Sequence, residues 1–286
     1  MTRILVTGAT GTIGGEIARQ LQARGEPIRV LVRNTAKGPK AGESTEVTIG
    51  DFAMLESLDA ALNRIERVFL ASFDSPDQSK LQRNVLMAAR RHGVHHIVRM
   101  STMAAHEKRH LPIFAWHSDC ERQLEASGLA FTHLRPSWVM QNFLSFVLGD
   151  MIRLPAGDGR VGFVDARDIA AVAVEALTTP GHEGKAYELT GPEALSYSDV
   201  AEQLSAAVGR SIIYKNILPE TYEREKTSQG WPRTSIDTML ALFADNKAGI
   251  NIDSVVTDTV ESVTGRAPFS FQEFAHDYAS KFRTGS

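Results

Sequence analysis

The sequence predicts an α/β protein built on a Rossmann-type, doubly wound parallel sheet, with a smaller, interleaved C-terminal α/β lobe. Short β-branched runs alternate with helical patterns through the first half of the chain, which is typical of βαβ units. Runs such as Ile4-Leu5-Val6 show no polar alternation, as expected of strands that helices cover on both faces. A glycine-rich turn follows this first run directly and leads into a helical pattern.

The element pattern divides the chain near its middle. We expect strands at residues 3–7, 28–33, 46–49, 67–71, 96–100 and 130–135, and helices at residues 12–24, 55–63, 77–92 and 114–126. Later we expect helices at residues 168–178 and 198–208, and only short strands near residues 160–164, 186–189 and 211–214. These patterns predict a Rossmann domain over residues 1–140 and a mainly helical cover lobe over residues 141–286, with a segment near 160–190 returning to the first domain.

Composition excludes several classes of protein. Of the 286 residues, 43% are hydrophobic and 23% are charged, which is typical of globular proteins and not of disordered chains. With 31 basic and 34 acidic residues the net charge is −3, so we expect neither nucleic acid nor an anionic membrane as a partner. No apolar run approaches the roughly 18 residues of a membrane span. The single cysteine, Cys120, allows no intramolecular disulfide, so a reducing cytoplasm fits best.

The glycine-rich turn predicts a dinucleotide site. Gly8 and Gly11 permit a tight turn and let backbone amides approach a pyrophosphate, while Gly14 permits close packing of helix on strand. The amino end of the helix adds donors and a favourable dipole. The G-x-x-G-x-x-G spacing departs from G-x-G-x-x-G, and an ordinary glycine turn is the alternative. The expected phosphate-binding residues are Gly8, Ala9, Thr10, Gly11, Thr12 and Ile13.

Arg33 and Asn34 end the second strand, where an NAD site usually has an acidic residue for the ribose hydroxyl. A guanidinium matches a 2′-phosphate instead, so NADPH is expected in preference to NADH, with Lys37 adding charge from the loop. The alternative is a solvated arginine at a strand end.

Two further strand ends are expected to bind the nucleotide. Asp51 and Phe52 follow the third strand, where they either contact the adenine or, in the case of Asp51, cap the next helix. Ala71, Ser72 and Phe73 follow the fourth strand, where a dinucleotide crosses the topological switch point.

Several motifs together resemble a known family. They are Val6–Gly14, Leu31-Val32-Arg33-Asn34, Gly50-Asp51, Leu134-Arg135-Pro136 with Gln141-Asn142-Phe143, Phe163–Ala170 and Gly181–Gly191. This set resembles the NmrA-like, atypical short-chain dehydrogenase/reductases over nearly the whole chain, and is most similar to type-2 NADPH:quinone oxidoreductases and to triphenylmethane and azo-dye reductases. The resemblance implies cofactor contacts at Pro136 and Ser137 as well.

The resemblance also assigns candidate catalytic residues. Ordinary members of the wider superfamily use a serine and a Tyr-x-x-x-Lys helix, in which the tyrosine delivers a proton. Ser101 matches the serine and is also expected to contact the cofactor, but His117 and Glu121 stand where the tyrosine and lysine would fall. All five tyrosines lie later in the chain. The quinone and dye reductases carry a similar His-x-x-x-Glu pair, which implies catalytic roles for Ser101, His117 and Glu121.

Three interpretations of His117 stay open. It donates a proton to the reduced acceptor, it positions a ligand, or it is a satisfied histidine whose partner one turn on is Glu121. Glu121 is expected to orient His117 or to favour its charged form, but it cannot replace the positive charge of a lysine. The missing lysine disfavours alcohol dehydrogenase chemistry more than quinone reduction, because solvent can protonate the anion of a conjugated acceptor.

The chain beyond the sixth strand is expected to line a substrate pocket with Trp138, Asn142 and Phe143. The alternative is that this apolar set packs on the core. No metal site is expected, because the pair His95-His96 has no carboxylate or cysteine at ligand spacing.

The sequence is compatible with three functions. The first is reduction of a quinone or similar conjugated acceptor, a small molecule, with hydride from NADPH. The second is a non-catalytic NADP(H)-binding redox sensor that acts through a protein partner. The third is a carbonyl or imine reductase of secondary metabolism. The sequence does not determine the oligomeric state, and a homodimer is one alternative.

Overall fold

The computed structural model describes residues 3–34, 42, 44–103, 105, 111–249 and 254–283. The chain forms two compact units. Unit 1 comprises Met1–Pro136, Ala166–Glu188 and Val263–Gly265, and unit 2 comprises Ser137–Asp165, Leu189–Ser262 and Arg266–Ser286. The chain therefore leaves unit 1 after the sixth strand, returns for one helix and one strand, and leaves again.

The sheet of unit 1 has seven strands in the order β10-β6-β5-β4-β1-β2-β3. The interior strand β1 pairs in parallel with β2 on one side and with β4 on the other, so that Leu5 lies opposite both Arg29 and Val68. The order reverses at β1, which confirms the doubly wound topology expected of a Rossmann-type sheet. The strands are β1 (Ile4–Val6), β2 (Ile28–Val32), β3 (Thr45–Ile49), β4 (Arg67–Leu70), β5 (His96–Met100), β6 (Ala130–Pro136) and β10 (Lys185–Leu189).

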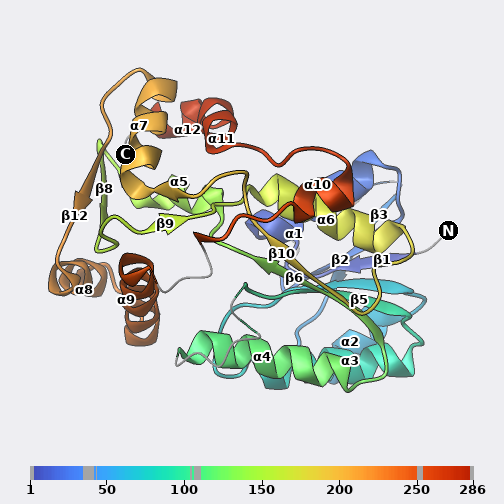
Figure 1. Ribbon diagram of the computed structural model, residues 1–286. Coiled ribbons are helices and arrows are strands. Elements are labelled where there is room, and N and C mark those ends of the chain that lie inside the picture. The colour runs from blue at the N-terminus through green and yellow to red at the C-terminus, as the bar shows by residue number, and fades with distance from the viewer. Residues whose placement is uncertain are drawn as a thin grey trace. The chain divides into compact units, whose positions relative to one another are not determined.

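Helices cover both faces of this sheet (Figure 1). On one face α1 (Thr12–Ala23) packs against α6 (Ala166–Thr178), and on the other α2 (Leu55–Leu62), α3 (Gln78–Arg91) and α4 (Pro112–Glu125) lie side by side. Because β1 is buried along its whole length, it carries continuous apolar sequence. β2 is equally buried and is apolar except for Arg29, which forms an ion pair with Glu46.

The predicted elements of the first half are all present in unit 1. The main difference lies at α4, which begins at Pro112, two residues before the expected start. Proline is favoured in the first turn of a helix because its missing N–H has no partner there and its φ is already helical.

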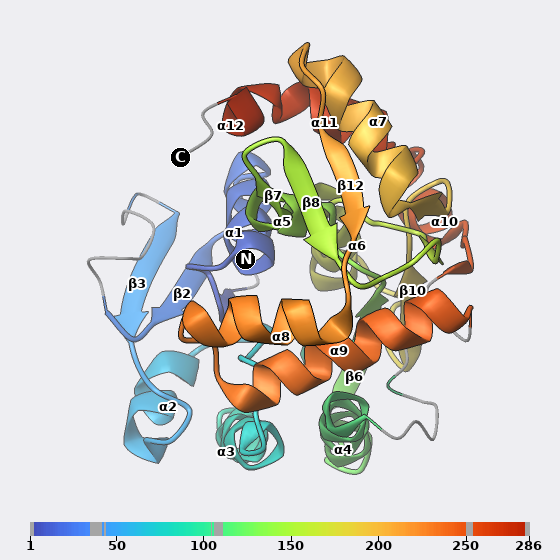
Figure 2. The ribbon, with the colours of Figure 1, turned by 90° about the vertical axis from the view of Figure 1, so that its left-hand side faces the viewer.

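Unit 2 contains two small sheets and several helices, and the larger of these sheets is seen in Figure 2. In the larger sheet β8 (Met151–Leu154) lies between β7 (Val147–Leu148) and β12 (Ile213–Asn216), and in the smaller one β9 (Arg160–Val161) pairs with β11 (Leu195–Ser196). The helices are η2 (Met140–Asn142), α5 (Phe143–Phe146), α7 (Tyr197–Val208), α8 (Pro219–Ser228), α9 (Arg233–Ala248), α11 (Phe271–Asp277) and α12 (Ala279–Arg283), while α10 (Thr259–Thr264) spans the boundary between the units.

No helix within the described residues is long and apolar enough to cross a membrane.

Candidate nucleotide and acceptor site

The turn between β1 and α1 brings two segments of backbone into close contact. Gly8 has a φ of 65°, a conformation that glycine adopts at little cost, and its carbonyl accepts a hydrogen bond from the Gly11 N–H at 2.9 Å. A Cβ added to Gly14 would lie 2.4 Å from the same Gly8 carbonyl oxygen. Only glycine at position 14 therefore lets α1 begin this close to the end of β1.

The amino end of α1 is left without a side-chain cap. Its N-cap is Gly11, and its first turn carries no acidic residue. In contrast, α7 and α11 begin with complete capping boxes, formed by Ser196 with Asp199 and by Ser270 with Glu273. The amino end of α1 thus presents backbone donors and a positive dipole, which suit a phosphate.

A cavity of about 520 Å³ lies in unit 1 beside this turn. The residues that line it come from the carboxyl ends of β1, β2, β3, β4 and β5, from the turn after β1 and from α3, so it occupies the edge of the sheet where open α/β folds bind ligands. They are Thr7, Gly8, Thr10, Gly11, Thr12, Ile13, Gly14, Leu31, Val32, Arg33, Gly50, Asp51, Phe52, Ala71, Ser72, Phe73, Ser75, Leu81 and Met100.

Most of the predicted nucleotide contacts thus lie around one cavity, although this does not test their roles. The predicted residues outside its lining are Ala9, Asn34, Ser101, Pro136 and Ser137. Ala9 is buried within the turn, and Asn34 is exposed next to Arg33. Lys37 lies outside the described residues.

Asp51 makes a turn rather than a helix cap. Its Oδ1 accepts the N–H of Ala53 at 2.8 Å, and the N-cap of α2 is Met54. This is the hydrogen bond of an Asx turn, which shapes the backbone before the helix begins. A hydrogen bond of 2.9 Å from Asn84 Nδ2 to the carbonyl oxygen of Phe52 fixes the backbone at Phe52. Of the two interpretations of Asp51, capping of α2 is therefore wrong, and a contact with the base stays a prediction.

The loop after β4 is tied to β1 by the hydroxyl of Thr7. Its Oγ1 accepts the N–H of Ala71 at 2.8 Å and lies 3.1 and 3.0 Å from the carbonyl oxygens of Phe69 and Ala71. Thr7 is itself buried. The end of β4 is consequently fixed where the cavity begins.

Glu121 forms a buried ion pair with Arg135. Its carboxylate accepts hydrogen bonds from Arg135 Nε and Nη2 at 3.0 and 2.7 Å, and from Ser101 Oγ at 2.6 Å. Burial raises the pKa of Glu121, but the hydrogen bonds from Arg135 and Ser101 outweigh burial and hold that pKa below its ordinary value. Glu121 is thus an ionised, fully engaged carboxylate that joins β5, α4 and β6.

His117 has other partners. Its Nδ1 lies 3.1 Å from Arg99 Nη2, and its Nε2 lies 2.9 Å from Asp74 Oδ1. Because a guanidinium only donates, Nδ1 must accept, which assigns the neutral tautomer whose Nε2–H donates to Asp74. His117 is also only 5% exposed.

The expected pairing of His117 with Glu121 is wrong, although both side chains lie on α4. The ring of His117 contacts residues of β5 and of the loop after β4, whereas Glu121 contacts Ser101 and Arg135. The two candidate residues therefore belong to separate hydrogen-bond networks.

Arg99 is the residue that the sequence analysis missed. It is fully buried, and its Nε donates to Gln82 Oε1 at 2.8 Å, while Gln82 Nε2 donates to Ser72 Oγ at 2.8 Å. An arginine directly after the apolar pair Ile97-Val98 of a buried strand is a detectable signal, because arginine is almost never fully buried without partners. Its partners Gln82 and His117 could not be found in the same way, since they lie 17 and 18 residues away along the chain.

The predicted substrate residues belong to unit 2. Phe143 is fully buried and meets Phe163 and Phe271 edge to face, at centroid distances of 5.0 and 5.2 Å. Trp138 is half-buried and stacks on Phe243 at 5.5 Å. Packing in the core of unit 2 accounts for both.

The two remaining predicted residues differ in exposure. Asn142 is exposed. Ser137 is buried, and its N–H donates to the carbonyl of Leu189 at 2.9 Å.

One cluster of potential metal ligands occurs within the described residues. Ligand atoms of Glu121, Glu125 and His133 lie within 4.8 Å of one another. However, the guanidinium of Arg135 already neutralises Glu121, and His133 Nε2 lies 3.2 Å from Glu125. The ion pair explains this cluster without a cation.

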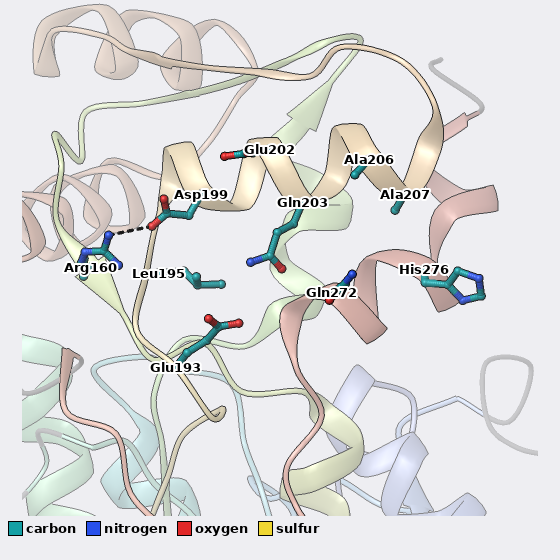
Figure 3. Close-up of a pocket in the computed structure, with 10 residues that line it drawn as sticks. All are labelled: Arg160, Glu193, Leu195, Asp199, Glu202, Gln203, Ala206, Ala207, Gln272 and His276. Carbon is teal, nitrogen blue, oxygen red and sulfur yellow. Dashed lines mark ion pairs between the residues drawn. The ribbon is translucent and has the colours of Figure 1, made fainter.

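A second cavity, of about 720 Å³, lies in unit 2 between α7 and α11 (Figure 3). Its lining mixes polar and apolar side chains, with Gln203 and Gln272 on facing helices and an ion pair of 3.1 Å between Arg160 and Asp199. The described residues predicted for the site do not contribute to it.

The sheet order, the glycine turn and the cavity at the carboxyl ends of the strands define a Rossmann-type α/β protein with the geometry of a dinucleotide site. The model of the NmrA-like family matches residues 1–275, so the chain belongs to the NmrA-like family. This confirms the resemblance that the sequence motifs indicate.

Named relatives give this family membership more detail. The chain is 39% identical over 288 residues to an NAD(P)H azoreductase of Xenophilus azovorans. The matched region covers 98% of this chain and 99% of the azoreductase. It is similar to the structure of the quinone oxidoreductase QOR2 of Escherichia coli complexed with NADPH, with a TM-score of 0.84 and 28% identity over 96% of this chain and 99% of that one. It is also similar to Citrobacter sp. triphenylmethane reductase complexed with NADP(H), with a TM-score of 0.84 and 25% identity over 98% and 100% of the two chains.

Replacing Gly14 with alanine should separate α1 from the turn after β1. Because the new Cβ meets backbone, we expect the free energy of unfolding to fall by about 1–3 kcal/mol and NADPH binding to weaken. Urea unfolding and calorimetric titration with NADPH measure the two effects. Gly42→Ala is the control, since a Cβ there meets nothing within 4 Å. A Gly14→Ala chain that matches this control in both measurements contradicts the interpretation.

Replacing Glu121 with glutamine should leave the charge of Arg135 without its partner. The two side chains are 5% and 14% exposed, so we expect the free energy of unfolding to fall by about 3 kcal/mol at neutral pH. Because folding lowers the pKa of Glu121, this stability is complete above the ordinary carboxyl pKa and is lost as the pH falls through the lower folded value. The difference from wild type should therefore shrink in acid.

Urea unfolding at neutral and at acid pH tests this expectation. Glu56→Gln, which alters an exposed carboxylate in the first turn of α2, should change little at either pH. Equal stability of Glu121→Gln and wild type at neutral pH would show that the ion pair does not contribute as described.

Proposed function

We propose that the protein is an NAD(P)H-dependent reductase that transfers a hydride from NADPH to a quinone or a similar conjugated acceptor. The observation that carries this proposal is the cavity of unit 1, where the uncapped amino end of α1 and the guanidinium of Arg33 line one space. The names of the azo, quinone and triphenylmethane reductases to which the chain is similar support the same chemistry.

The residues of the cavity suit the separate parts of the nucleotide. Backbone amides from Gly11 onward would bind the pyrophosphate, and Asp51 and Phe52 would contact the adenine. The backbone at Ala71 and Ser72 would hold the middle of the nucleotide, where it crosses the sheet. When bound, the reduced nicotinamide supplies the hydride.

Among the described residues, neither of the candidate acids His117 and Ser101 has a free proton to donate to the product. Both ring nitrogens of His117 are engaged by Arg99 and Asp74, and the hydroxyl of Ser101 donates to Glu121. We therefore propose that His117 and Ser101 maintain the geometry of the site, and that solvent protonates the reduced acceptor. This arrangement favours a conjugated acceptor, which spreads the negative charge, over a simple carbonyl or an imine, which needs an acid in place.

The same observation supports a second candidate function. A chain that binds NADP(H), and whose described candidate acids His117 and Ser101 are engaged by other groups, also fits a redox sensor that signals to a protein partner. The two functions differ in turnover, since a sensor binds the nucleotide without oxidising it.

Arg33 should determine the choice between NADPH and NADH. We expect Arg33→Asp to reverse the preference, because a carboxylate repels the 2′-phosphate and accepts from the ribose hydroxyl. The loss of one charge-assisted contact should cost NADPH about 2 kcal/mol of binding free energy. Calorimetric titration with both nucleotides measures the ratio, with Arg90→Asp, at the last turn of α3, as the charge-matched control. An unchanged ratio of dissociation constants removes Arg33 from the site.

The reductase itself is tested by oxidation of NADPH, followed through the absorbance of the reduced nicotinamide. A panel of quinones, an azo dye and a triphenylmethane dye serves as acceptors, and calorimetry measures binding of NADPH and NADP+. We expect saturable, acceptor-dependent turnover. Tight binding of both nucleotides without turnover on any acceptor would contradict the reductase and favour the sensor.

A further inference from the structure

Arg99 sits inside the sheet of unit 1 with no exposed surface. Burial lowers the pKa of its guanidinium, but a guanidinium stays charged in proteins. The groups with which it interacts include Gln82 on α3, His117 and Cys120 on α4, and, electrostatically, the carboxylates of Asp74 and Glu121. Because burial also raises the pKa of Cys120, that thiol supplies no compensating charge.

A fully buried arginine contributes little net free energy to folding, so stability alone does not explain Arg99. Removing an ion from water costs several kcal/mol, and a whole buried ion pair can often be replaced by apolar residues of similar volume without loss of stability. What Arg99 does provide is a rigid fork of donors that can hold two acceptors in fixed relative positions.

The two arms of this fork lead to one loop. Through Nε, Arg99 holds Gln82, whose amide donates to Ser72 Oγ. Through Nη2, it holds His117, whose Nε2–H donates to Asp74 Oδ1. The arms therefore end on either side of Phe73, a residue that is 85% exposed and lines the nucleotide cavity.

We propose that Arg99 is a positioning residue for the nucleotide: it fixes the loop of residues 72–74 through two hydrogen-bonded arms, and His117 belongs to one of these arms. This inference rests on the proposed function, since it assumes that the cavity binds NADPH. Binding to a loop already held in place avoids the entropy of ordering it, so loss of the arms weakens affinity without altering the reacting groups.

The test compares Arg99→Met with wild type in the full-length protein. We expect the dissociation constant of NADPH, measured by calorimetry, to rise about tenfold. The value of kcat at saturating NADPH and acceptor should change less than twofold. Urea unfolding without nucleotide shows that the variant is folded under the conditions of the titration, since Gln82 and His117 each lose a buried donor. Arg99→Lys should not restore affinity, because the donors of an ammonium share one nitrogen and lack the fixed fork that reaches two separated acceptors. Arg122→Met, on the exposed side of α4, is the control and should bind like wild type.

Single-arm variants test whether the two arms act through Arg99. Gln82→Leu and His117→Phe should each weaken NADPH binding, and neither should weaken it further when added to Arg99→Met. These variants also carry the test if Arg99→Met does not fold.

The outcomes separate this inference from the proposed function. An Arg99→Met chain that binds NADPH like wild type, or that is merely less stable with unchanged affinity, overturns the positioning role alone. If Arg99→Met does not fold, single-arm variants that bind like wild type overturn it in the same way. A wild-type chain that does not bind NADPH overturns both proposals.

Discussion

The clearance between Gly8 and Gly14 is the constraint on which the candidate site depends. A methyl group at position 14 would lie 2.4 Å from the Gly8 carbonyl, so only glycine lets α1 begin directly beyond the end of β1. Because β1 is a fully buried strand with β4 and β2 on its two sides, the turn cannot move aside to make room. The uncapped amino end of α1 is thereby held at the carboxyl edge of the sheet, where the cavity lies.

Hydrogen bonds of polar side chains fix the other segments around the cavity. Thr7 ties the end of β4 to β1, and Arg99 supports the next residues of the loop through Gln82 and His117. Ser101 is engaged in the same way by Glu121, which in turn binds Arg135. Ser101, His117 and Glu121 are therefore all engaged by other groups of the protein. This is the physical basis of the proposal that the acceptor is conjugated and takes its proton from solvent.

The sequence was most informative where a physical requirement is local. Continuous apolar runs predict buried parallel strands, and three glycines between a strand and a helix predict the turn, so the fold of unit 1 and most of the cavity lining followed directly. The partners of His117 and Glu121 could not be predicted, because Asp74, Arg99 and Arg135 lie on other elements and meet α4 only after the sheet has formed. In unit 2, strands of two residues such as β7 and β11 are too short for any periodicity to appear.

The most direct measurement of the central claim, hydride transfer from NADPH to an acceptor, is a single-turnover reaction with nicotinamide deuterated at C4. The wild-type protein is loaded with NADPH carrying deuterium in one or the other of the two C4 positions and is then mixed with a quinone. We expect rapid oxidation that deuterium slows at one position and not at the other, because a protein-bound nicotinamide presents one face to the acceptor. Oxidation no faster than that of free NADPH with the same quinone, although the nucleotide is bound, would contradict the claim.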